Sequence, residues 1–504
     1  MFLPKRHHTA MPISDPTHFV SPPRTATAVT LSLAIAALLS ACAAPHAPAV
    51  PATEGVPDAF TAQFKETAGV GSGETGNPAS GSTVQSDWWS VFQDPELNAL
   101  EQQLLIGNEN LKLIVAQVAS ARAALQGSDR AGQPTLNASL GGTRSAATGS
   151  GNNTASPLNA VSANATASWE PDLWGRLALA TQNSQATLRA SESDLAAARL
   201  SAQSTLAQSY FSLRSAEAQQ ALLSESLQAY QRALELTQAR YDSGVAARTD
   251  VLQAQAQLES ARTQASEAAA TRAQVEHAIA VLLGKAPSVF SIPVTAHLPD
   301  PVSVPNTLPG ALLQRRPDIA AAQFRVRAAY AQIGVTDAAY FPSVTLSASG
   351  GYSQSSLANL LSAPNLLWSL GASLTENVFD AGVRQQASET ARATAAQTTA
   401  SYRSLVLTAL QEVEDNLVLV RHLNHEVQSQ TAAWQANVRT LEITNAQYQA
   451  GTVGYLSVTS AQSAALSSQI TLISVQTRLL NATNVLLKNT AGPWNTGPEQ
   501  RPAT

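Results

Sequence analysis

The chain has 504 residues and a formal net charge of −5, so its electrostatics give no support for a nucleic-acid partner. Its single cysteine excludes an intrachain disulfide, and the lack of any run of about 20 apolar residues excludes a membrane-spanning helix. Only 13% of the residues are charged and 5% are aromatic. Ala, Ser, Gln and Thr are frequent among the rest, and the small side chains allow helices and strands to approach closely.

Residues 1–41 have the pattern of a secretory signal peptide, with basic residues ahead of a short apolar core at 26–39. The start codon is either Met1 or Met11. The segment ends in Leu39-Ser40-Ala41-Cys42, which resembles the lipobox of bacterial lipoproteins. In that interpretation Cys42 carries S-diacylglycerol and N-palmitoyl groups, which anchor the amino terminus in outer-membrane lipid. The alternative is an ordinary signal peptide with a chance cysteine.

A flexible, lipid-anchored tether is expected at residues 42–86, which are rich in Pro, Ala, Gly, Ser and Thr. Two helices should follow. Asp94-Pro95 can cap and begin the first, and the second is expected from Asn110 to Arg130. Apolar and polar residues then alternate through 135–143 and 159–170, which predicts a hairpin of two strands of about ten residues.

A second hairpin with the same alternation lies about 208 residues further on, at 343–350 and 366–375. Transmembrane β-barrels require strands of this length and pattern, although a soluble sandwich with one wet face uses the same alternation. Four strands are too few to close a barrel, and lipid does not tolerate an open sheet edge. A membrane location therefore requires an oligomer, in which two copies give eight strands and three give twelve.

Each hairpin leads into a long stretch without Gly or Pro, at 176–243 and 383–450. Residues at intervals of seven are mostly apolar in both, which predicts long helices that pack lengthwise on other helices. At 1.5 Å per residue each would reach about 100 Å. The heptad positions are Leu206, Leu213, Gln220, Leu227, Leu234 and Tyr241 in the first stretch, and Val406, Val413, Val420, Val427, Trp434, Leu441 and Tyr448 in the second.

The two halves are an internal duplication of about 200 residues. The two long predicted helices, 176–243 and 383–450, are called rods below. Both end in a Tyr-x-x-Gly turn, where the glycine can take the left-handed conformation that closes a helix. Return helices are expected at 245–283 and 455–489. The predicted organisation is a first repeat at 87–284, a Pro-rich linker at 285–316, a second repeat at 317–491 and a tail at 492–504.

Several motifs, in their order and spacing, resemble the outer membrane factor (TolC-like) family, and most closely its OprM-like efflux lipoproteins. The resemblance covers about residues 38–492. The motifs are the lipobox at Cys42, Trp88-Trp89-x-x-Phe92-x-Asp94-Pro95-x-Leu97, Asp172-Leu173-Trp174-Gly175-Arg176, Arg315-Arg316-Pro317-Asp318-Ile319, Ile333-Gly334-Val335 with Phe341-Pro342, and the two Tyr-x-x-Gly turns.

The resemblance implies an α+β membrane protein with the TolC-like α/β-barrel fold. Four transmembrane strands per chain would complete a twelve-stranded outer-membrane barrel in a homotrimer, above a periplasmic coiled-coil α-barrel of twelve helices. Such a trimer is the exit duct of a tripartite efflux system. It exports small molecules such as drugs that come from a periplasmic adaptor protein and an inner-membrane pump, usually a resistance–nodulation–division (RND) transporter. The resemblance implies no catalysis, no cofactor and no metal.

The resemblance also places adaptor docking and gating at the periplasmic tips of the rods. The tip residues are Tyr241, Ser243, Gly244, Tyr448, Ala450 and Gly451. Leu456 falls where OprM-like channels have a constricting Leu, and Ser460 stands where they have a gate Asp. The missing carboxylate removes a candidate acidic ring, and Asp250 could supply charge instead.

Other functions fit these residues less well. The sequence has no Gly-rich phosphate loop between a predicted strand and helix, no HExxH motif and no nucleophile elbow, which are common marks of an enzyme. A lipid-anchored coiled-coil spacer would explain the heptads and Cys42 but not the duplicated strands. Protein secretion with an ATP-driven pump is a third hypothesis. His422 and His425 share a helix face and could bind a metal, but a polar helix face is the commoner meaning of this spacing.

Overall fold

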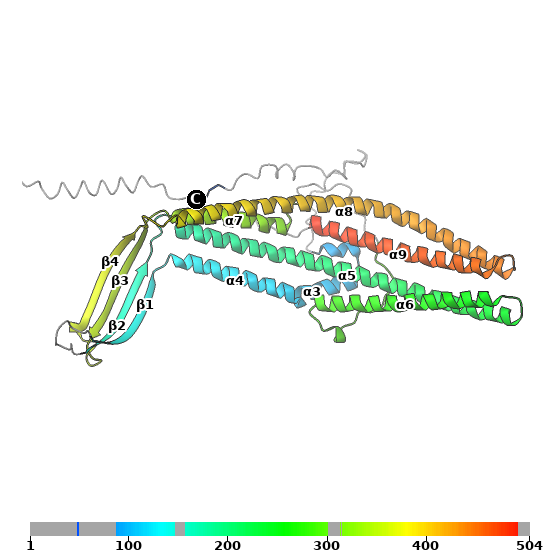
Figure 1. The fold of residues 1–504 in the computed structure, drawn as a ribbon, viewed down its shortest axis with the longest axis horizontal. Coiled ribbons are helices and arrows are strands. Elements are labelled where there is room, and N and C mark those ends of the chain that lie inside the picture. Colours follow the sequence, from blue (N-terminus) through cyan, green and yellow to red (C-terminus); the bar gives the residue numbers. More distant parts are fainter. Residues whose placement is uncertain (1–47, 50–86, 147–156, 301–312, 314, 492–504) are drawn as a thin grey trace, which may run out of the picture.

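The computed structural model describes residues 48–49, 87–146, 157–300, 313 and 315–491, and these form an elongated molecule (Figure 1). A four-stranded sheet occupies one end. Long helices run from the sheet to the opposite end, where two tight turns each connect one long helix to the helix that follows it. None of the described helices has both the length and the apolar character needed to cross a membrane.

Both halves contain a helix, a two-stranded hairpin and a pair of long helices in that order, and the first half has an additional α-helix at its start. The first half contains η1 (Trp88–Phe92), α3 (Pro95–Gly107), α4 (Glu109–Ala131), β1 (Thr135–Ser145), β2 (Leu158–Trp169), α5 (Arg176–Asp242) and α6 (Arg248–Leu282). The second contains η2 (Pro287–Val289), α7 (Pro317–Ala338), β3 (Ser343–Gln354), η4 (Ala363–Asn365), β4 (Leu366–Thr375), α8 (Val383–Gln449) and α9 (Tyr455–Ala491).

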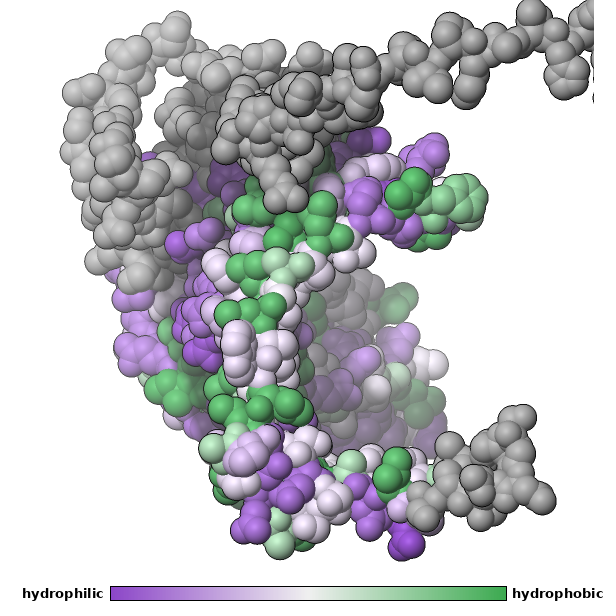
Figure 2. Space-filling view, turned by 90° about the vertical axis from the view of Figure 1, so that its left-hand side faces the viewer, coloured by the Kyte–Doolittle hydropathy of each residue, from purple (hydrophilic) through white to green (hydrophobic). Residues whose placement is uncertain are grey.

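The sheet is antiparallel, in the order β1-β2-β3-β4, so β1 and β4 are its edges. The register places most apolar residues of the four strands on one face, for example Leu140 opposite Ala163 and Ala348 opposite Leu370. Serine, threonine and asparagine cover most of the other face. Viewed from the sheet end, apolar residues form an interrupted band along the strands (Figure 2). The large apolar side chains are exposed, with Leu370 and Leu140 about three-quarters accessible (75% and 74%).

Helices α5 and α8 are 67 residues each and confirm the predicted rods to within one residue. Each begins after a left-handed glycine, Gly175 (φ 75°) or Gly382 (φ 89°), so the chain turns sharply from strand into helix. The heptad positions nearest the sheet end are buried, among them Leu206, Leu213 and Val413. Those nearer the far end are only half-buried.

The main core surrounds the middle of the rods. Trp88 and Trp89 are buried there with Phe211 and leucines of α3, so both side chains contribute to packing. Asp94 caps α3, as predicted, by accepting hydrogen bonds from the backbone N–H groups of Glu96 (2.9 Å) and Leu97 (3.1 Å). Its other oxygen accepts a bond from the Tyr210 hydroxyl at 2.6 Å. The cap therefore also fixes α3 to α5.

Buried and partly buried ion pairs fasten the chain between the first rod pair and the second repeat. Arg214 and Arg272 both bind Glu217, at 2.6 and 3.0 Å, and both donate to backbone oxygens just after η2. At the start of the second repeat, Arg316 binds Asp318 (2.7 Å) and Glu412 of α8 (2.9 Å). The Arg-Arg-Pro-Asp motif is thus a helix start with local ion pairs.

Candidate functional site at the paired helical turns

The two turns at the far end of the molecule share one backbone geometry. Gly244 (φ 74°) follows α5; its N–H donates to the Tyr241 oxygen at 2.9 Å, and the Val245 N–H donates to the Arg240 oxygen at 2.8 Å. This pair of bonds around a left-handed residue closes a helix. The second turn repeats them with Gly451 (φ 74°) N–H to Tyr448 O at 3.1 Å and Thr452 N–H to Gln447 O at 3.0 Å.

Both glycines are required for their backbone angle. A Cβ atom placed on either would meet nothing within 4 Å, so space does not restrict these positions. A positive φ is unfavourable for residues with a side chain, and most of all for β-branched ones. The turns therefore present an unobstructed, defined surface at the end of the molecule.

Arg240, in the last turn of α5, joins the two turns. Its guanidinium carbon lies 4.7 Å from the centre of the Tyr448 ring. The same group donates hydrogen bonds to the backbone oxygens of Tyr448 and Gln449, both at 3.4 Å. A cation is favourable over an aromatic face and beside the last carbonyls of a helix. This side chain thus connects the α5–α6 hairpin to the α8–α9 hairpin.

Tyr448 continues this contact into a small core. Its ring packs edge-on against Tyr455, with the ring centres 5.3 Å apart, and Tyr455 is buried with Ala254 and Val458. Burial raises the pKa of the Tyr455 hydroxyl to about 12, and the neighbouring Tyr448 adds to the effect. The phenol therefore stays neutral, and the cluster holds α6, α8 and α9 together beside the turns.

The remaining predicted site residues surround this cluster. Leu456 and Ser460 lie one turn apart on α9, both exposed, and the Ser460 hydroxyl donates to the Leu456 oxygen at 2.9 Å. Asp250 is half-buried in the first turn of α6. Ser243 and Ala450 are exposed and Tyr241 is half-buried.

Sequence reasoning overlooked Arg240. The only signal for it is a basic residue in the last turn of a helix, a common feature of helix ends. The duplication does not point to it either, because the equivalent position in the second repeat is Gln447. Its partners lie 208 residues away along the chain and become neighbours only in the folded molecule.

Two further positions were weighed from the sequence. The predicted lipidation site, Cys42, lies outside the described residues. His422 and His425 are exposed on α8, far from the turns along the helix, and no group of three or more potential metal ligands occurs in the described part of the chain.

Comparison with known proteins identifies the family. The family model for outer membrane efflux proteins matches residues 100–285 and 308–492, which is most of the chain. This chain belongs to the outer membrane efflux protein family. Among its relatives, the pyoverdine export outer membrane protein OpmQ of Pseudomonas aeruginosa is 30% identical over 82% of this chain and 90% of OpmQ. The cation efflux system protein CusC of Escherichia coli is 27% identical over 77% and 84%.

Solved structures of outer membrane efflux proteins have the same fold. The outer-membrane channel OprN superposes with a TM-score of 0.78 at 28% identity, covering 87% of this chain and 97% of OprN. CusC superposes with a TM-score of 0.74 at 27% identity, covering 81% and 94%. The chain is thus a TolC-like efflux channel of the outer membrane, and the fold and function that the sequence predicted are confirmed.

Proposed function

We propose that this chain is the exit duct of a tripartite pump: a homotrimer that docks onto a periplasmic adaptor and receives substrate from an RND-type inner-membrane transporter. The arrangement of the two ends carries this proposal. A sheet with one apolar and one polar face lies at one end, and two matched, unobstructed helical turns lie at the other. The sheet suits a lipid boundary, and the turns suit a protein partner.

In this duct, the exposed tip residues Ser243, Gly244, Ala450 and Gly451 make the adaptor contact. The Arg240 link holds the two hairpins of each chain together at rest. Leu456 and Ser460 on α9, with Asp250 on α6, form the constriction. Because a serine replaces the gate carboxylate, the narrowest ring is less acidic than in OprM-like channels.

Small molecules of varied chemistry are the proposed substrates. The printed names of the relatives include pyoverdine export, toluene efflux and cation efflux, so similar channels serve very different compounds. The pump therefore selects the substrate, and the duct supplies only a continuous polar path. It has no catalytic step and needs no cofactor.

Photo-crosslinking in cells tests the assignment. A photo-reactive amino acid at Ala450, exposed in the second turn, should capture an adaptor protein together with an RND pump. The same probe at Gln385, exposed near the sheet end of α8, is the control and should capture neither. Capture of an ATP-driven transporter would favour protein secretion instead. Capture of no partner from Ala450, in cells that contain the oligomer, would contradict the docking site.

A lipid anchor on Cys42 is part of the same proposal. It rests on the lipobox-like segment and on the 27% identity with the probable outer membrane lipoprotein SilC of Salmonella typhimurium. Cys42→Ser should abolish labelling of the protein by radioactive palmitate, because no other cysteine is present. Label that persists in the variant would disprove the anchor.

A further inference from the structure

The polar face of the sheet consists of neutral side chains that can form hydrogen bonds. The strand register places on this face the odd-numbered residues of β1, β3 and β4 and the even-numbered residues of β2. Of these 23 residues, 17 are Ser, Thr or Asn, three are Gly and three are Leu or Ala. The face is therefore polar without carrying a charge in any of the four described strands.

The four strands as a whole are almost free of charge. They contain 11, 12, 12 and 10 residues and only one charged side chain, Arg144, although 13% of the whole chain is charged. Arg144 shares its face with Leu140 and Gly142, so it lies on the apolar face, near the end of β1 that leads into the hairpin loop. The segments that connect the strands of each hairpin, 146–157 and 355–365, also contain no Asp, Glu, Lys or Arg.

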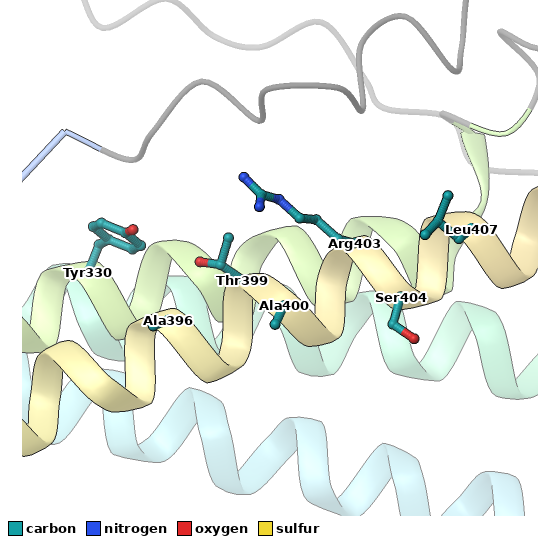
Figure 3. A pocket seen from close by; sticks show the side chains of 7 residues that line it. All are labelled: Tyr330, Ala396, Thr399, Ala400, Arg403, Ser404 and Leu407. Carbon is teal, nitrogen blue, oxygen red and sulfur yellow. The ribbon is translucent and has the colours of Figure 1, made fainter.

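Exposure to solvent does not account for this composition, because the exposed surfaces of the helices carry charged residues. Arg403 extends from α8 beside an open groove that Ala400 and Leu407 also line (Figure 3). On α6, Arg262 and Glu259 form an ion pair at 2.6 Å, with more than half of each side chain exposed. The strands thus differ from the helices in composition and not only in exposure.

Ion pairs neutralise the first carboxylate that follows each of β2 and β4. Glu170 pairs with Arg176 at 2.8 Å. Arg384 pairs with Glu376 at 3.2 Å and with Asp380 at 2.7 Å. Opposite charges that lie this close produce only a weak field at a distance, and salt screens exposed charges over about 8 Å. These residues therefore add little net charge at the helix end of the polar face.

Hydroxyl groups on this face bond across the strands. The Thr135 hydroxyl donates to the Ser168 backbone oxygen at 3.2 Å, and the hydroxyl oxygens of Ser349 and Ser369 lie 2.8 Å apart. A hydroxyl or a side-chain amide both donates and accepts hydrogen bonds, so it can offer a proton to an anion and an oxygen lone pair to a cation. These groups also stay uncharged at physiological pH. A solute of either sign would thus meet a wall of the same kind.

Fixed charges are the usual means by which a pore selects ions. Rings of charged side chains favour solutes of the opposite sign. Low-dielectric walls focus the field of such charges, which raises the local concentration of one sign of solute at the expense of the other. A wall built from the polar face described above would generate no such preference.

We propose that the outer-membrane section of the duct is a neutral, hydroxyl-lined passage that admits anionic and cationic solutes equally. This inference rests on the proposed function, which makes the polar face of the sheet the wall of a pore, and it adds which solutes this section accepts. Any preference of the whole channel for one sign of charge then arises in the helical part, where Asp250 lies.

The electrostatic potential at the wall is measured with a single cysteine in the full-length protein. Thr166 is exposed on the polar face and lies opposite Asn137 of β1. In outer-membrane vesicles, Thr166→Cys is treated separately with a cationic and an anionic methanethiosulfonate reagent, and the remaining thiol is quantified by gel-shift labelling. The ratio of the two rates, divided by the same ratio for free mercaptoethanol, should lie within about twofold of one. The parent, with only Cys42, gives the background.

A matched charge calibrates this measurement. Asn137→Asp, added to Thr166→Cys, introduces a carboxylate of nearly the same shape beside the reporter. It should raise the normalised ratio about tenfold, because a charge about 6 Å away speeds the cationic reagent and slows the anionic one by about threefold each. Ser347→Cys, exposed on the polar face of β3, is a second reporter and should match Thr166→Cys.

Ala165→Cys is the control for the face. Ala165 is the exposed neighbour of Thr166 on the apolar face, so lipid should protect the new thiol from both charged reagents. A normalised ratio more than about fivefold from one at both Thr166→Cys and Ser347→Cys would overturn the neutral passage. An unchanged ratio after Asn137→Asp would do the same, since the wall would then not control the local potential.

The control also separates this inference from the proposed function. If Ala165→Cys stays protected, either of those results overturns only the neutral passage and leaves the channel intact. If Ala165→Cys reacts as fast as Thr166→Cys, the apolar face does not lie against lipid, and the proposed function is contradicted as well.

Discussion

At the scale of single residues, Glu101 is the least expected feature of the core. The residue is fully buried in α3 (0% exposed), and neither carboxylate oxygen has a hydrogen-bond partner among the described residues. Desolvation raises the pKa of this carboxyl group from 4.5 to about 9. The folded protein therefore holds a proton there at neutral pH that the unfolded chain releases.

This difference makes stability depend on pH. A carboxyl group whose pKa is raised on folding destabilises the fold least below about pH 4.5. As the pH rises from there towards 9, the free energy of unfolding falls by about 1.4 kcal/mol per pH unit. Glu101→Gln mimics the protonated form. We expect it to raise the thermal midpoint at pH 8 and to flatten the decline between pH 5 and pH 9, followed by circular dichroism in detergent.

Glu109→Gln is the control for this experiment, because Glu109 is exposed and bonds only the neighbouring Lys112 (2.9 Å) among the contacts described. Its melting curve should follow that of the parent at every pH. If Glu101→Gln also follows the parent, Glu101 is ionised in the fold and must have a partner.

At the scale of elements, Arg240 couples two helical hairpins at their ends. Arg240→Ala removes the cation–π contact and two hydrogen bonds to backbone oxygens, together worth about 1–2 kcal/mol. The hairpins should separate more readily, so we expect higher single-channel conductance in planar bilayers. Arg240→Lys should give an intermediate value, since it keeps the charge but loses the planar fork. Arg232→Ala, on the exposed side of α5, is the control and should leave the conductance unchanged. If Arg240→Ala also leaves the conductance unchanged, Arg240 does not hold the two hairpins together in the resting channel.

The turn geometry gives a second prediction at this scale. Gly451→Val forces a β-branched residue towards φ 74°, which costs at least about 1 kcal/mol and distorts the turn. Efflux should fall while the amount of oligomer in the outer membrane stays normal, as measured by drug susceptibility and immunoblotting. Gly454→Val is the matched control, because Gly454 does not have a positive φ. Normal efflux with Gly451→Val would show that the adaptor does not require this turn.

The elements were largely predictable from the sequence because their signals are local and repeated. The heptad pattern predicted the ends of α5 and α8 to within one residue. Strict alternation predicted all four strands, although β3 extends to Gln354, beyond the predicted end at Gly350. Helix α6 begins at Arg248 and not at Val245, since the closing turn uses Val245. The Arg240 link and the unpaired Glu101 could not be foreseen, because both depend on residues far apart in the chain.

At the scale of the whole molecule, the chain is two equivalent halves that do not satisfy each other completely. The second half covers the first, because β3 pairs with β2 and α7 packs against α5. Among the described residues, the second half makes no comparable packing at the corresponding places. The duplication is therefore symmetric in its elements but not in the contacts that those elements make within the described chain.

The equal length of the two rods limits how this protein can change over generations. Both turns end level because α5 and α8 have 67 residues each. Loss of one heptad from α5 alone would draw one turn back by about 10 Å, and a partner resting on both turns would meet an uneven rim. The length of the helical part can therefore change in evolution only if insertions or deletions of the same size occur in α5, α6, α8 and α9 together.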